Sequence, residues 1–108
     1  MFHALRRQMK RDFRKPLVIA GPKGLLRNNK CISKFEDMGP GTKFERIWEY
    51  RNADKISECE TIILCSGKFV YEIDEILDKE KKERTALLTI EELFPFPESE
   101  LKEILSKC

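Results

Sequence analysis

The sequence predicts an α/β fold in which helices pack on a largely parallel sheet. Two apolar runs, Thr61–Cys65 and Thr85–Ile90, are continuous rather than alternating, which is typical of strands covered on both faces. Between them, the apolar residues of 69–77 recur at spacings of four, three and one, so they share one broad face of a helix. A strand, a helix and a strand within about 30 residues form a βαβ unit, whose crossover is expected to be right-handed.

The composition fits one modest domain. The chain has 108 residues, of which 41% are hydrophobic and 37% are charged, so the apolar share suffices for a core although the charged share is above the usual quarter. The formal net charge is only +2, which gives little support for non-specific binding of nucleic acid or of a membrane surface. No apolar run approaches the ~18 residues of a membrane-spanning helix. We therefore expect neither nucleic acid nor a membrane span.

The cysteines give no signal for a metal site. Cys31, Cys59, Cys65 and Cys108 form no Cys-x-x-Cys pair, and the single histidine, His3, lies far from them in sequence. Zinc sites normally combine such closely spaced ligands. Free, reduced thiols are the simpler interpretation, and they fit a cytosolic or matrix compartment.

The first predicted element is a helix over residues 2–13. Its apolar residues fall at spacings of three, four and four: Phe2, Leu5, Met9 and Phe13. Residues 1–15 also carry six cations against one acid, and an amphipathic, arginine-rich start of this kind fits a mitochondrial transit peptide. Transit peptides are usually rich in serine, however, and none occurs before Ser33. We therefore favour an ordinary helix that packs its apolar stripe on a core.

A short strand is expected over residues 17–20, which form a continuous apolar run. Pro16 separates this run from the helix, since the residue before a proline is pushed away from helical angles. Gly21 and Pro22 end the strand. Residues 23–29 then read as a basic loop or a single helical turn.

The middle of the chain is expected to be less regular. Ser33 is placed to cap a short helix that carries Phe35 and Met38, with Glu36 at the position that a capping box requires. The sequence Gly-Pro-Gly at 39–41 marks a turn. Residues 44–49 alternate in polarity and predict a strand with mixed faces. Residues 51–58 are polar and are expected to form a surface loop.

The end of the chain predicts one more helix. Residues 93–97 cannot form a central strand, because each of the two prolines removes a backbone donor. Residues 98–107 then form a helix with Leu101, Ile104 and Leu105 facing inward. Glu98 stands at the positive end of its dipole.

Two segments are candidates for anion contact. Ser66, Gly67 and Lys68 lie between a predicted strand and a helix N-terminus, where α/β folds hold phosphates. One glycine is neither a P-loop nor a dinucleotide motif, so a tight turn that needs glycine for its backbone angles is the simpler alternative. Lys23 and Arg27 place two cations just past another predicted strand, and a solvated basic loop or an anchor to a neighbouring domain is again the alternative.

Other polar and aromatic residues give weaker signals. His3 has no carboxylate near it in sequence, so a general-base role has no support and a structural role is expected. Trp48 and Tyr50 are expected to be packing residues, since no RNA-binding signature accompanies them.

Five blocks of sequence, in order, resemble the C-terminal region of the first, thiamine-diphosphate-dependent component of 2-oxoglutarate dehydrogenase. They are FHALRRQ at 2–8, RKPLVIAGPKGLLR at 14–27, FEDMGPGTKF at 35–44, CSGKFVY at 65–71 and IEELFPFP at 90–97. Any one block alone is weak, but the ordered set is specific. The related dehydrogenase that acts on 2-oxoadipate shares this region and stays open as an alternative. Gly24 departs from the serine that the family usually carries in the basic loop.

The resemblance implies a transketolase C-terminal-like α/β domain that is incomplete. Residues 1–21 would be the last helix and strand of the pyrimidine-binding domain, and residues 22–108 part of the C-terminal domain. The chain would then be a fragment, truncated at both ends. The family binds thiamine diphosphate and magnesium through segments that precede this region, so the resemblance assigns no catalytic, cofactor-binding or metal-binding residue here.

The resemblance also implies the function of the whole enzyme. The family decarboxylates 2-oxoglutarate and transfers the succinyl group to a lipoyl-bearing succinyltransferase component. Expected partners are the remainder of the subunit, a homodimer partner and that succinyltransferase. The location would be the mitochondrial matrix in a eukaryote and the cytoplasm in a bacterium. In some bacterial relatives the basic region belongs to an allosteric acyl-CoA site. The resemblance therefore suggests, as a hypothesis, that Arg27 contacts such an effector.

A second hypothesis comes from another class of protein. The chain could be a free-standing small α/β regulatory module that holds an anion with the 66–68 turn, Lys23 and Arg27. The ordered set of motifs favours the enzyme fragment, which alone is expected to be catalytically inactive.

Overall fold

The computed structural model describes all residues from 1 to 108 and divides them into two compact units. The N-terminal unit comprises residues 1–44 and the C-terminal unit residues 45–108. Each unit is described by itself. None of the helices is long and apolar enough to cross a membrane.

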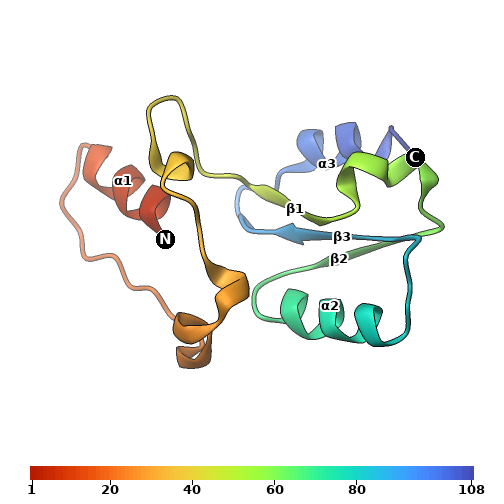
Figure 1. Cartoon of the computed structure of the whole chain (residues 1–108). Helices are drawn as coiled ribbons and strands as arrows, with labels where there is room; N and C mark the ends of the chain where they lie inside the picture. The colour runs from red at the N-terminus through yellow and green to blue at the C-terminus, as the bar shows by residue number, and fades with distance from the viewer. The chain divides into compact units, whose positions relative to one another are not determined.

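The C-terminal unit is a small α/β body with a three-stranded mixed sheet (Figure 1). Its elements in chain order are β1 (Ile47–Arg51), the 3₁₀ helix η4 (Ala53–Glu58), β2 (Thr61–Cys65), α2 (Phe69–Lys79), β3 (Thr85–Ile90) and α3 (Glu98–Leu105). The strand order is β1-β3-β2, with β2 parallel and β1 antiparallel to β3. The predicted strand–helix–strand unit is therefore confirmed, and the strand predicted at 44–49 lies slightly later, at Ile47–Arg51.

The central strand β3 is covered on both faces, as its continuous apolar sequence predicts. Residues Thr85 to Thr89 are all buried. On one face, Leu87 packs with Val70 and Leu77 of α2. On the other face, Leu88 belongs to a second cluster, against which residues of η4 and α3 pack. The two helices lie on opposite sides of the sheet in Figure 1.

The segment after β1 differs from its prediction as a surface loop. Residues 53–58 form η4, and Ile56 is only 4% exposed. The local sequence is polar apart from Ala53 and this isoleucine, so no periodic signal marks the segment. Its single large apolar side chain nevertheless joins the core cluster of Ile47 and Leu88.

The segment after β3 is irregular, as the two prolines predict. It has a cis peptide bond between Phe94 and Pro95, and Pro97 is fully buried before α3 begins. The helix α3 ends at Leu105 rather than at Lys107. Leu101 and Ile104 pack against the core, as expected, while Leu105 remains partly exposed.

The N-terminal unit has a helix but no core of its own. Its elements are α1 (Phe2–Lys10) and the 3₁₀ helices η1 (Lys23–Arg27), η2 (Asn29–Cys31) and η3 (Glu36–Met38). None of residues 1–44 is buried. The helix α1 ends at Lys10 rather than at Phe13, because Arg11 is already extended, with ψ of 151°.

The predicted strand over residues 17–20 is wrong. These residues pair with no strand and are exposed. An apolar run becomes a parallel strand only when neighbouring strands supply hydrogen bonds and helices cover its faces. The N-terminal unit supplies no such neighbour.

The expected cap at Ser33 is also wrong. The backbone N–H of Lys34 donates to Asp37 Oδ2 at 2.8 Å, so an aspartate closes this turn from inside it. Asn28, by contrast, caps η2 from the position before it, because its Oδ1 accepts from the N–H of Lys30 at 2.9 Å.

The turn between β2 and α2 requires a glycine. Gly67 has φ of +64°, a left-handed angle that residues with a Cβ adopt at a cost of about 1 kcal/mol. A Cβ at this position would meet no atom within 4 Å, so the cost of Gly67→Ala is expected to come from the backbone alone. We expect Gly67→Ala to lower the free energy of unfolding by about 1 kcal/mol in urea denaturation. Gly67→Asn is the matched control and should cost less, since asparagine tolerates this angle; equal costs would contradict the backbone explanation.

Candidate functional site

The predicted anion turn is exposed, and its cation is already paired. Ser66, Gly67 and Lys68 are all exposed at the start of α2. The Lys68 Nζ lies 2.6 Å from Glu72 Oε1, one helical turn away. The hydrogen bond to Glu72 raises the pKa of the Lys68 ammonium. The positive φ of Gly67 confirms the tight-turn interpretation, while anion contact at this turn stays a prediction.

The other two candidate cations belong to the N-terminal unit. Lys23 begins η1 and Arg27 ends it, and both side chains are exposed. The structure does not bring these cations together with the 66–68 turn in one described unit. Their proposed contact with an anion therefore stays a separate prediction.

His3 has a structural position, as expected. Its Nε2 lies 2.8 Å from the carbonyl oxygen of Asp37, and Nδ1 is buried without a hydrogen-bond partner. The ring also contacts Phe2 edge-to-face, with centroids 5.3 Å apart. Arg6 donates to the carbonyl oxygen of Thr42, so α1 is tied to the end of its own unit by polar contacts.

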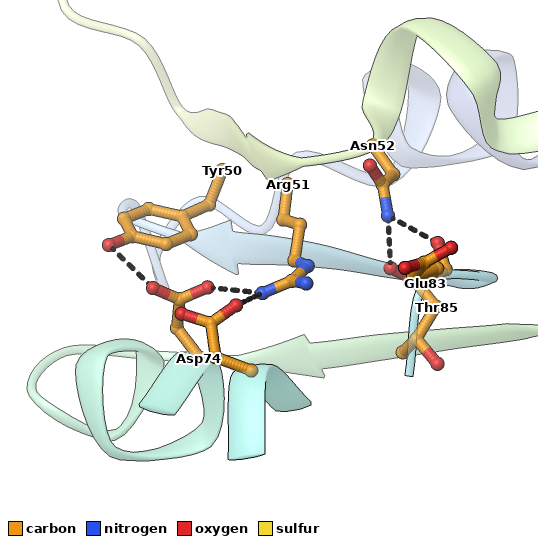
Figure 2. Close-up of polar contacts among 7 residues, drawn as sticks. Tyr50, Arg51, Asn52, Asp74, Glu83 and Thr85 are labelled. Atoms are coloured by element: carbon orange, nitrogen blue, oxygen red, sulfur yellow. Dashed lines mark hydrogen bonds and ion pairs between the residues drawn. The ribbon is translucent and has the colours of Figure 1, made fainter. Parts of the chain in front are cut away.

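A network of polar contacts surrounds Arg51, and the sequence did not predict it (Figure 2). Arg51 ends β1, and its Nη1 donates to Asp74 Oδ1 at 2.9 Å and to Asp78 Oδ1 at 2.5 Å. Both carboxylates belong to α2. The hydrogen bond to Asp78 is the largest of the effects that raise the pKa of the Arg51 guanidinium. The network thus joins an edge strand to the helix that covers the sheet.

Asp74 is the buried member of this network. It is only 8% exposed and lies on the same helical stripe as the buried Val70 and Leu77. The hydroxyl of Tyr50 is 3.5 Å from Asp74 Oδ2, at the limit of a hydrogen bond. The ring of Tyr50 meets those of Trp48 and Tyr71 edge-to-face at 5.3 and 5.9 Å, which confirms the packing role expected for Trp48 and Tyr50. A carboxylate on an apolar stripe was the one sequence signal that could have revealed the network.

A second arginine, Arg46, joins the other end of β1 to the segment after β3. Its Nε lies 2.6 Å from Glu92 Oε2, Nη1 lies 3.3 Å from Glu100 Oε1, and Nη2 donates to the carbonyl oxygen of Pro95 at 3.0 Å. The hydrogen bond to Glu92 raises the pKa of the Arg46 guanidinium. Arg46 therefore fixes the irregular chain that leads into α3.

Asn52 fastens the end of β1 to the start of β3. It adopts left-handed angles, with φ of 54°, and its Nδ2 donates to the carbonyl oxygens of Glu83 at 2.8 Å and Thr85 at 2.9 Å (Figure 2). Asparagine suits this position because it tolerates these angles and also supplies two donors.

Substitution of Asn52 is expected to separate the contribution of its side-chain hydrogen bonds from that of its left-handed backbone angles. Asn52→Ala should lower the free energy of unfolding by about 2 kcal/mol, from the lost hydrogen bonds and the strained backbone together. Asn52→Gly removes the hydrogen bonds but relieves the strain, so it should cost about 1 kcal/mol less than the alanine variant. Chemical denaturation, monitored by circular dichroism, measures the free energy of unfolding of both variants. Equal losses in the two variants would show that the backbone angle contributes nothing.

The charged residues of the Arg46 and Arg51 networks hold elements of the fold together. The carboxylates of the two networks already accept hydrogen bonds from arginine. Burial, together with the negative charge of Glu91, raises the pKa of the Cys65 thiol, and a raised pKa makes a thiol a poor nucleophile. No three His, Cys, Asp or Glu residues are placed to hold a metal ion.

Comparison with known proteins gives the family. Residues 32–108 match the family model described as 2-oxoglutarate dehydrogenase C-terminal. A probable 2-oxoadipate dehydrogenase complex component E1 homolog of Dictyostelium discoideum is 40% identical over 109 residues, and the 2-oxoadipate dehydrogenase complex component E1 of Danio rerio is 44% identical over 110. The 2-oxoglutarate dehydrogenase E1 component of Azotobacter vinelandii is 41% identical over 106 residues.

Each of these matches covers 98% of this chain but only 11–12% of the relative. The chain thus spans about an eighth of the length of the curated relatives that it matches. The sequence identity is 40% or more over almost the whole chain, and the family model covers well over half of the chain. The chain therefore belongs to the 2-oxoglutarate dehydrogenase C-terminal family.

Proposed function

We propose that this chain is the C-terminal part of the first, decarboxylating component of a 2-oxo acid dehydrogenase complex. The substrate of the whole enzyme would be a dicarboxylic 2-oxo acid, 2-oxoglutarate or 2-oxoadipate. The observation that carries the proposal is the similarity over 98% of the chain to E1 components of both kinds. The whole enzyme would use thiamine diphosphate and magnesium, bound outside these residues.

Within that enzyme, these residues would form a structural body. The support is that the two arginine networks hold β1, α2 and the entry to α3 together. The fold would be that of a transketolase-like C-terminal domain, with the boundary to the pyrimidine-binding domain near residue 21. Partners would be the remainder of the subunit, a homodimer partner and a lipoyl-bearing succinyltransferase component. The location would be mitochondrial in a eukaryote and cytoplasmic in a bacterium.

The alternative of a free-standing anion-binding module is not favoured. The relatives carry the matching sequence within chains about eight times as long, which suits one region of a large subunit. In the 66–68 turn, moreover, the only cation is already paired with Glu72.

A segment exchange tests the proposal. The matching region of the Azotobacter vinelandii E1 component is replaced by this chain, and decarboxylation of 2-oxoglutarate is measured with thiamine diphosphate and magnesium. The chimera is expected to retain most of the activity, because the exchanged region supplies packing rather than reacting groups. A chimera that folds and binds thiamine diphosphate but has no activity would contradict the structural role. An equivalent exchange into the Danio rerio protein is assayed in the same way with 2-oxoadipate as the substrate.

The chain by itself is expected to be inactive. Purified residues 1–108, supplied with thiamine diphosphate, magnesium and either 2-oxo acid, should release no carbon dioxide above the protein-free rate. Measurable turnover that follows the purified chain through chromatography would overturn the proposal that the reacting groups lie elsewhere.

A further inference from the structure

We draw no further inference here: the strongest candidate, the uncharged edge of the sheet along β2 with its exposed Leu64, carries nothing, because nothing in the structure shows what covers it.

Discussion

Replacing Arg51 with methionine is expected to lower the free energy of unfolding of the C-terminal unit by about 3 kcal/mol. The substitution keeps much of the side-chain volume but removes the guanidinium that donates a hydrogen bond to Asp74 Oδ1. Asp74 is only 8% exposed and lies on the buried stripe of α2, so water cannot replace the lost partner well. Trp48, the single tryptophan, lies on the same strand as Arg51 and reports the unfolding of this unit by fluorescence in urea.

Two further variants make this prediction specific. Arg84→Met removes an ion pair with Glu60 whose side chains are 67% and 65% exposed, and such surface pairs contribute less than about 1 kcal/mol. Arg51→Met combined with Asp74→Leu removes both charges and should recover most of the lost stability, since a buried pair is often no better than an apolar replacement. If Arg51→Met costs no more than Arg84→Met, the Arg51 network does not hold α2 to the sheet.

The elements that the sequence predicted well are those whose signal is local and strong. The strands Thr61–Cys65 and Thr85–Ile90 have the predicted bounds, because each apolar run stops at a charged residue or at the Ser66–Gly67 turn. Burial on both faces was predicted for both strands but is found only for Thr85–Ile90, since no residue of Thr61–Cys65 is buried. The helix between them follows a clear periodicity of apolar side chains. The turn at Gly67 was predictable from the glycine alone, and its positive φ agrees.

The elements that failed depend on neighbours that a local pattern does not specify. Residues 17–20 are as apolar as a buried strand, yet no strand of the N-terminal unit pairs with them. Ile56 shows the converse, since one isoleucine in a polar stretch is enough to join the core. In both cases packing decided the outcome, not propensity.

The polar networks were missed for the same reason. Arg51 finds its carboxylates 23 and 27 residues later, and Arg46 finds Glu92 46 residues later. No spacing rule connects residues so far apart in a chain. Only Asp74 carried a signal, because a charge on the buried stripe of an amphipathic helix requires a partner. The anion candidates, by contrast, were chosen from local composition, and in one of them the lysine proved to be paired with Glu72.

Truncation of the central strand is the second change expected to have a large effect. Leu88→Ala should lower the free energy of unfolding by about 3 kcal/mol, because Leu88 is fully buried and the surrounding elements cannot close on the cavity without moving β3. Ile47 and Ile56 pack in the same cluster from β1 and η4, so they would line that cavity.

Leu87→Ala creates the equivalent cavity on the other face of the same strand, against Val70 and Leu77, and should cost a similar amount. Leu93→Ala is the matched control, because Leu93 is 66% exposed and its truncation should change stability by less than about 0.5 kcal/mol. Urea denaturation, monitored by Trp48 fluorescence, compares the free energies of unfolding of all three variants, with one common slope for the dependence of that free energy on urea concentration. If Leu88→Ala costs much less than Leu87→Ala, then α3 and η4 cover their face of the sheet loosely. The C-terminal unit would then depend on α2 alone for its stability, and the layer beside α3 would be the first to open.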